Sequence, residues 1–139
     1  MIARIYLLEV QYLAHSLATK WLGWDEPIPE FDTRPPHKLE SCIETPFQTY
    51  AKKDLYPAFE RKAAAIFYLM IKNHPFQNGN KRIAVTTLFC FLDKNSKWLS
   101  VGPQELYNMA IWVASSPAIT KDQTIEAIEV FLKKYMVDA

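Results

Sequence analysis

The chain has 139 residues, of which half are hydrophobic and 14% aromatic, and its formal net charge is +1. This length suits one domain with its own apolar core, so we expect residues 1–139 to form a single domain, and the composition excludes a disordered chain. A net charge this close to zero predicts no overall attraction to nucleic acid or to an anionic membrane. Any binding of anions must therefore be local.

The N-terminal segment, residues 1–22, is apolar enough to resemble a signal peptide or a membrane anchor. Arg4, Glu9 and Lys20 interrupt it, so no uncharged stretch approaches the roughly 18 residues of a membrane span. We therefore expect a cytoplasmic protein with no membrane partner. The periodicity predicts a helix from residue 5 to residue 22. Its buried face is expected to consist of Leu8, Tyr12, Leu13 and Leu17.

The rest of the chain also has helical periodicity, and with three glycines and no hairpin motif it argues against a β fold. Four prolines in residues 25–36 predict an extended connection. Residues 47–54 could form either a loop or a small hairpin. The further helices predicted are residues 38–44, 57–73, 83–92, 104–115 and 120–136. We expect a compact all-α bundle of five to seven helices, in which residues 83–92 are buried on every side.

The two cysteines, Cys42 and Cys90, lie in apolar, helix-like surroundings and have no CxxC or Cys/His spacing. Free cysteines in such positions usually act as small buried hydrophobic residues. We expect that role for both, and neither a metal site nor a reactive thiol.

One polar stretch, HPFQNGNKR at residues 74–82, connects two predicted core helices. Gly79 allows a tight turn or a positive φ, and Asn80 is a natural cap for a helix that begins near Lys81. The N-terminus of that helix would offer amide N–H groups and a positive dipole end to an anion. Lys81 and Arg82 are unfavourable in the first turn unless something negative offsets them. A bound phosphate is the simplest candidate.

His74 opens this stretch, and histidine is the side chain best suited to exchange a proton near neutral pH. Close to a phosphate seat, it could deprotonate an attacking hydroxyl. Phe76 is expected to turn inward and anchor the loop. Each feature alone has a plainer interpretation: a histidine before a proline is usually solvated, and Gly-Asn before two cations is usually only a helix start. Together, at fixed spacing, they carry more weight.

The stretch resembles the signature of the Fic/Doc family, HxFx(D/E)GNxR, and is closest to the death-on-curing (Doc) branch, whose loops read HxFxDxNKR. The likeness runs from about residue 38 to residue 136. It includes Leu39-Glu40-Ser41, Asp54-Leu55-Tyr56-Pro57, Ala63-Ala64-Ala65 running into Asn73-His74, Phe91-Leu92, and the helix from Thr124 to Tyr135. The resemblance implies an all-α fold in which the active loop joins two core helices.

Members of this family transfer a phosphate-containing group from a nucleotide, usually ATP, to a hydroxyl of a target protein. The resemblance implies that His74 is the general base and that Lys81 and Arg82 take part in catalysis. Gly79, Asn80, Lys81 and Arg82 would bind the nucleotide phosphates. ATP and Mg²⁺ are the cofactors it implies.

Three positions refine what the resemblance implies. Lys81 stands where AMP-transferring members usually have glycine, and Val85 where they often have a second arginine; both features favour Doc-like phosphoryl transfer over AMP transfer. Asn78, implied as the Mg²⁺ ligand, replaces the expected Asp or Glu and lacks the charge that Mg²⁺ prefers. Activity could therefore be attenuated, supported by a carboxylate elsewhere, or lost in a nucleotide-binding regulatory module.

The leading hypothesis is a Doc-like toxin, blocked in trans by an antitoxin, because the self-inhibiting motif (S/T)xxxE(G/N) of the family is not found in the sequence. Its target protein could be a translation factor, by analogy. Residues 47–53 resemble the flap that aligns the target. The plainest alternative is a helical interaction domain whose loop has no chemistry.

Overall fold

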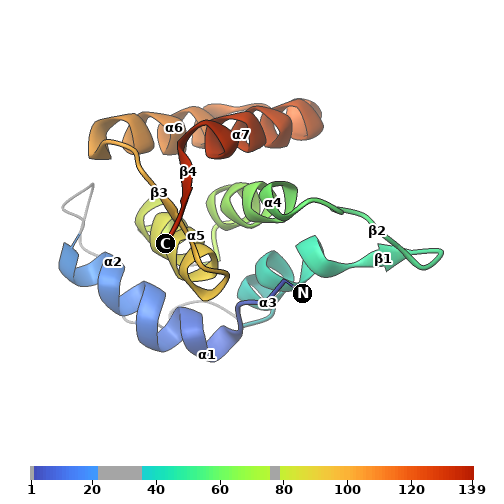
Figure 1. The fold of residues 1–139 in the computed structure, drawn as a ribbon, viewed down its shortest axis with the longest axis horizontal. Coiled ribbons are helices and arrows are strands. Elements are labelled where there is room, and N and C mark those ends of the chain that lie inside the picture. The colour runs from blue at the N-terminus through green and yellow to red at the C-terminus, as the bar shows by residue number, and fades with distance from the viewer. Residues whose placement is uncertain (1, 22–35, 76–78) are drawn as a thin grey trace.

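The computed structural model describes residues 2–21, 36–75 and 79–139. The fold is predominantly helical, as the sequence predicts, with two small two-stranded sheets among the described residues. Figure 1 shows two central helices, α4 and α5, with α6 and α7 on one side and the N-terminal helices on the other. One continuous cluster of buried side chains runs through these layers.

The two central helices are α4, Phe59–Lys72, and α5, Asn80–Lys94, which pack against each other. Every residue of α4 from Lys62 to Ile71 is buried, and three consecutive alanines there let neighbouring helices approach closely. Most of α5 is also buried, as predicted for residues 83–92, except that Phe89 and Cys90 are only partly buried. The stretch His74–Arg82 therefore begins at the end of one core helix and finishes in the first turn of the next.

The N-terminal helix is built from α1, Leu7–Glu9, a π-helical turn, Val10–Ala14, and α2, His15–Trp21. The helix is where the periodicity predicts it, but the predicted buried face is wrong. The side chains expected inside are exposed: Leu8 by 63%, Tyr12 by 68%, Leu13 by 50% and Leu17 by 39%. Val10, Ala14 and Ala18 are fully buried instead. Small side chains allow the backbone to approach α5, and the wider π turn shifts the helical phase.

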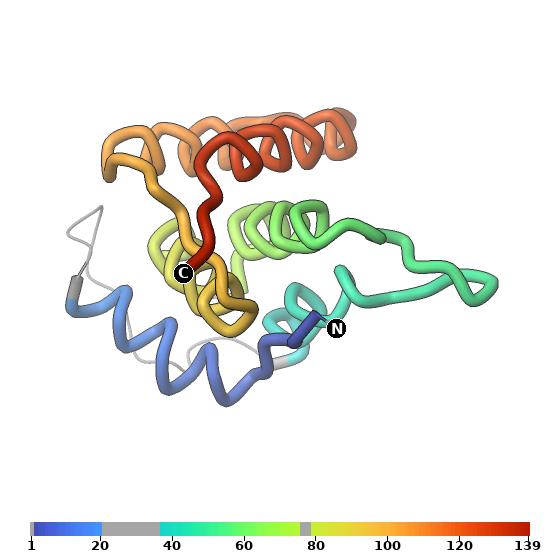
Figure 2. The backbone as a smooth tube through the Cα atoms, viewed as in Figure 1, coloured from blue at the N-terminus to red at the C-terminus, as the bar shows by residue number. Residues whose placement is uncertain are grey.

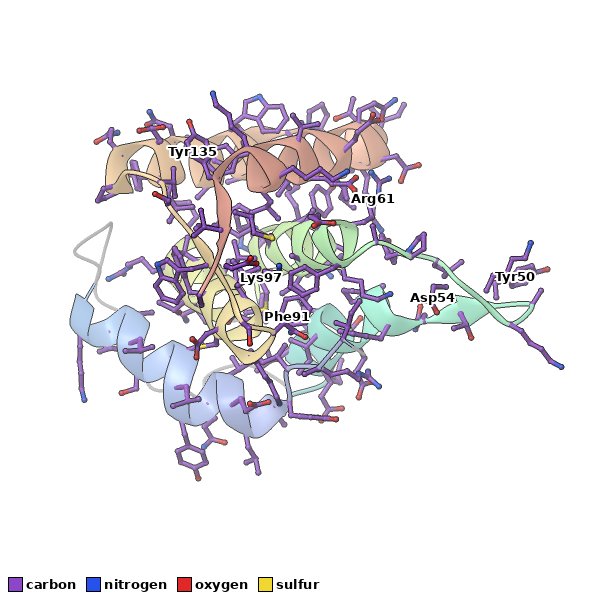
Figure 3. The ribbon with its side chains drawn as sticks, viewed as in Figure 1. Tyr50, Asp54, Arg61, Phe91, Lys97 and Tyr135 are labelled. Carbon is purple, nitrogen blue, oxygen red and sulfur yellow. The ribbon has the colours of Figure 1, made fainter. Side chains whose placement is uncertain are left out.

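The segment between this helix and α4 contains α3, Pro36–Glu44, a 3₁₀ turn, Thr45–Phe47, and a hairpin of β1, Thr49–Tyr50, and β2, Lys53–Asp54. The predicted connection over residues 25–36 lies outside the described residues except for Pro36. Of the two alternatives for residues 47–54, the hairpin is the one observed. It projects away from the helices, and Tyr50 lies near its tip (Figure 3).

The C-terminal half contains α6, Pro103–Ser115, a 3₁₀ turn, Ala118–Thr120, and α7, Lys121–Tyr135, close to the predicted limits. Thr120 caps α7 by position only, because its hydroxyl donates to the Pro117 carbonyl instead of accepting from the helix. The sequence reading missed a second sheet, in which β3, Lys97–Leu99, pairs with β4, Met136–Asp138, in antiparallel register. Figure 2 shows that this pairing brings the C-terminal end back beside α5.

Within residues 2–21, 36–75 and 79–139, none of the helices combines the length and the hydropathy needed to span a bilayer.

Candidate active site at the α4–α5 connection

His74 stands two residues beyond the end of α4. The helix stops at Lys72, and Asn73 caps it, with its backbone N–H donating to the Leu69 carbonyl at 2.9 Å. The backbone of His74 then adopts φ of 47°, a left-handed conformation that is uncommon for residues other than glycine. His74 is exposed, and Pro75 after it is buried. The reversal of the chain thus places the imidazole at the surface while the next residue fixes the loop to the core.

Gly79 begins α5. Its φ of 76° is left-handed, as expected from the sequence, and its carbonyl accepts the N–H of Ile83 at 2.9 Å. The cap is therefore Gly79 and not Asn80, which is the first residue of the helix. The helix begins one residue earlier than predicted, so the Asn80 side chain does not stand at the cap position and can contact the loop.

The structure brings His74 and Asn80 together across the connection. Nδ2 of Asn80 lies 3.5 Å from Nδ1 of His74, and this amide can donate to the ring nitrogen in the tautomer that leaves Nδ1 without a proton. A contact on one ring nitrogen restrains the imidazole at the mouth of α5. Since Asn80 is 9% exposed and His74 is exposed, the contact links a buried amide to a side chain that a substrate can reach.

The first turn of α5 is electropositive. It contains Lys81 and Arg82 and no acidic residue. Arg82 is only 5% exposed, so its charge is held in a setting where water screens it weakly. An α-helix cannot satisfy its first N–H groups by itself, and the positive end of its dipole adds to the two cations. Such a helix start fits an anionic group, above all a phosphate.

A hollow of about 380 Å³ borders the same connection and is lined by His37, Lys38, Ser41 and Asn73. Three of these residues belong to α3, and Asn73 immediately precedes His74. Lys38 brings a further cation to this side of the loop. No sequence motif points to His37 or Lys38. Only the fold brings α3 against the end of α4.

Two of the predicted site residues, Phe76 and Asn78, lie outside the described residues. Their predicted roles as loop anchor and metal ligand remain predictions. Among the described residues, no group of three or more His, Cys, Asp or Glu side chains is placed to hold a metal ion. The donors present at the start of α5 are amides and cations, which suit phosphate and do not suit a hard cation. A magnesium ion would therefore depend on residue 78 and on the phosphates of a bound nucleotide.

The two thiols are poor nucleophiles in this fold. Burial raises the pKa of Cys42 to about 12 and that of Cys90 to about 11. Both thiols therefore stay protonated near neutral pH, as expected for structural cysteines. Cys42 is fully buried as predicted, whereas Cys90 is only partly buried.

A family model described as the Fic/DOC family matches residues 8–92, which include the whole α4–α5 connection and most of α5. The comparisons with curated proteins and with solved structures gave no match.

Proposed function

The chain belongs to the Fic/DOC family, whose members are typically protein-modifying transferases, and from this premise we propose that it transfers a phosphoryl group from ATP to a hydroxyl of a target protein. The observation that carries the proposal is the pairing of His74 with the start of α5. An exposed imidazole, contacted by Asn80 at 3.5 Å, stands beside a helix N-terminus with two cations and no carboxylate in its first turn.

In the proposed reaction, a ring nitrogen of His74 takes the proton of the target hydroxyl as its oxygen attacks the γ-phosphorus of ATP. A new P–O bond forms to the target, and the bond between the γ-phosphorus and the β,γ-bridging oxygen breaks. ADP leaves with that oxygen and its electron pair. Arg82, Lys81 and the first amides of α5 offset the negative charge on the phosphate oxygens. When bound, Mg²⁺ would supply further neutralisation of those oxygens.

Phosphoryl transfer is favoured over AMP transfer on two sequence positions. Lys81 occupies the place of a glycine in AMP-transferring relatives, and Val85 that of a second arginine. A lysine in the first turn adds a point charge and bulk close to the phosphate seat. This favours a nucleotide bound in the opposite sense to that in AMP-transferring members. AMP transfer, in which the α-phosphorus is attacked and pyrophosphate leaves, is the alternative reaction at the same site.

A second candidate function is a nucleotide-binding regulatory module with little or no catalysis. It is favoured by Asn78, which provides an amide oxygen where a carboxylate is expected. The phosphate seat at the start of α5 does not require that carboxylate, so binding can persist when transfer is slow. Calorimetry with ATP separates the two functions, because a regulatory module binds ATP and transfers nothing, even after Asn78→Asp.

The biological role we propose is that of a toxin restrained by a separate antitoxin, acting on a cytoplasmic target such as a translation factor. Support comes from the Doc-like loop and from the lack of the family's self-inhibiting motif in the sequence. Co-expression with the product of a neighbouring gene should relieve growth arrest if this role is right. Growth unaffected by expression of the wild-type chain would contradict it.

The transfer itself is tested by incubating the purified chain with Mg²⁺, cell lysate and ATP labelled at either the α or the γ phosphorus. We expect a labelled protein band from γ-labelled ATP only. His74→Ala and Arg82→Ala should abolish it, and His15→Ala, in the N-terminal helix, should not. Label from α-labelled ATP would replace phosphoryl transfer by AMP transfer, and no label from either would remove the proposed activity.

A further inference from the structure

Cys42, a buried residue of α3, contacts the last turn of α4, just before the turn that presents His74. The thiol of Cys42 donates to the carbonyl oxygen of Leu69 at 3.4 Å, and the side-chain amide of Asn73 donates to the same sulfur at 3.9 Å. Leu69 O also accepts the backbone N–H of Asn73 at 2.9 Å. The Leu69 carbonyl, the Cys42 thiol and Asn73 thus contact one another at the last turn of α4.

We infer that Cys42 and Asn73 are positioning residues for His74, and this inference rests on the proposed function. The thiol fixes where α4 ends and how Asn73 leaves it, and His74 follows in a left-handed conformation with φ of 47°. Because His74 follows Asn73 directly, a shift of Asn73 moves the backbone that carries the imidazole. Neither residue touches the reacting atoms.

The chemistry of a thiol suits this task. Cys42 is fully buried, and burial raises its pKa to about 12, so the S–H donor is retained at any pH at which the protein works. Sulfur is also large enough to reach both the carbonyl of Leu69 and the amide of Asn73. Alanine would fill part of the same space and form neither contact, while serine would retain a donor and an acceptor.

The site geometry supports a positional role over simple core filling. Asn73 lines the hollow that it shares with Lys38 and Ser41 of α3, so the same amide borders the surface next to His74. A core residue with no such link would affect stability alone. A positioning residue should affect the chemical step, because displacement of a catalytic group lowers the rate without weakening the binding of substrate elsewhere.

The test compares Cys42→Ala, Cys42→Ser and Asn73→Leu with Cys90→Ala, a matched change at the second cysteine, on α5. We expect Cys42→Ala to lower kcat about 3- to 10-fold, the range for loss of one or two weak hydrogen bonds, with an unchanged KM for ATP. Cys42→Ser should restore most of the rate. Cys90→Ala should match the wild type.

Two further measurements make the result decisive. The double variant of Cys42→Ala and Asn73→Leu should lose no more activity than either single variant, since both act through one contact. In nuclear magnetic resonance spectra without nucleotide, the imidazole signals of His74, assigned with His74→Ala, should shift in Cys42→Ala and not in Cys90→Ala. These signals report positioning even if the chain transfers nothing, so failure of the proposed function is seen separately.

The inference is overturned if the His74 signals of Cys42→Ala coincide with those of the wild type. It is also overturned if Cys42→Ser loses more kcat than Cys42→Ala, because that order is expected when a polar atom is merely buried in a core.

Discussion

The hydroxyl of Thr86, in the middle of α5, donates a hydrogen bond of 2.7 Å to the carbonyl oxygen of Ala14. Ala14 is the last residue of the π-helical turn in the N-terminal helix. An extra residue in a helical turn changes the regular hydrogen-bond pattern. Here a side chain of α5 donates to a carbonyl at the end of that turn. The bond links the N-terminal helix to α5, the helix whose start is the proposed phosphate site.

Thr86→Val should lower the free energy of unfolding by about 1–3 kcal/mol, because the Ala14 carbonyl would be left buried without this donor. Urea unfolding measures the change. The matched control is Thr87→Val at the next residue. Among the described residues, the fully buried hydroxyl of Thr87 has no hydrogen-bond partner. Its removal should leave stability unchanged or raise it, and an equal loss in both variants would contradict the assigned role of Thr86.

Lys62 is a charged residue inside the protein, 4% exposed, and it holds the segment that leads into α4. Its ammonium group donates to the carbonyl of Tyr56 and contacts the Pro46 carbonyl and the Asp54 carboxylate, each at 3.4 Å. Asp54, labelled in Figure 3, belongs to the hairpin of β1 and β2. The Lys62 side chain therefore holds the hairpin at both of its ends.

Lys62→Met should lower the free energy of unfolding by about 2–3 kcal/mol, since two carbonyls lose their donor while the aliphatic stem is replaced. In hydrogen-exchange measurements, the increase in exchange rate over the wild type should be larger at residues 45–56 than at α6. Lys52→Met, at the exposed turn of the hairpin, is the control and should alter neither quantity. Unchanged exchange at residues 45–56 in Lys62→Met would refute the anchoring role.

The parts of the fold that the sequence predicts well depend on local signals. Gly79 has the left-handed conformation that its place in the loop requires. The segments that form α4 and α5 are long and strongly apolar, so their periodicity fits only a helix. The face of the N-terminal helix could not be predicted in this way, because large and small apolar residues alternate around it. Which face is buried depends on how closely α5 approaches.

The small sheets were harder to predict for a different reason. Ala51 and Lys52 both have positive φ in the turn between β1 and β2, where glycine or asparagine is the usual signal. Strands β3 and β4 pair residues about forty positions apart, so no local pattern indicates them. Likewise, the contact of Cys42 with Asn73 exists only because α3 packs on α4.

The pair of β3 and β4 carries an exposed ion pair whose effect depends on pH. Nζ of Lys97 lies 2.5 Å from Oδ1 of Asp138. The hydrogen bond and charge of Lys97 lower the pKa of Asp138, and those of Asp138 raise the pKa of Lys97. The contribution of Asp138 is therefore present above its unfolded pKa and is lost as pH falls through its lower folded pKa. That of Lys97 is present below its unfolded pKa and is lost as pH rises through its higher folded value.

We expect hydrogen exchange at β4 to be slowest relative to the rest of the protein between these two limits. Asp138→Asn should remove that advantage and leave the overall melting temperature unchanged within error, because both side chains are at the surface. An exchange rate at β4 that responds equally to pH in wild type and Asp138→Asn would contradict the role of this pair.

Under the proposed function, we expect the residue at position 78 to set the rate of transfer. Asn78→Asp should strengthen the Mg²⁺-dependent part of ATP binding in calorimetry and raise transfer by about 10-fold or more, since a carboxylate is the ligand that Mg²⁺ prefers. Asn78→Ala should do neither. If Asn78→Asp binds Mg²⁺ and ATP more tightly and still transfers nothing, the chain is a regulatory module and not a weakened transferase.

The most direct test of the central claim is the fate of the γ-phosphate. Intact-mass analysis of a target labelled in lysate should show the addition of one phosphoryl group with wild type, and none with His74→Ala, while both proteins bind ATP equally in calorimetry. Equal modification by wild type and His74→Ala would contradict the assignment of the active site to the α4–α5 connection.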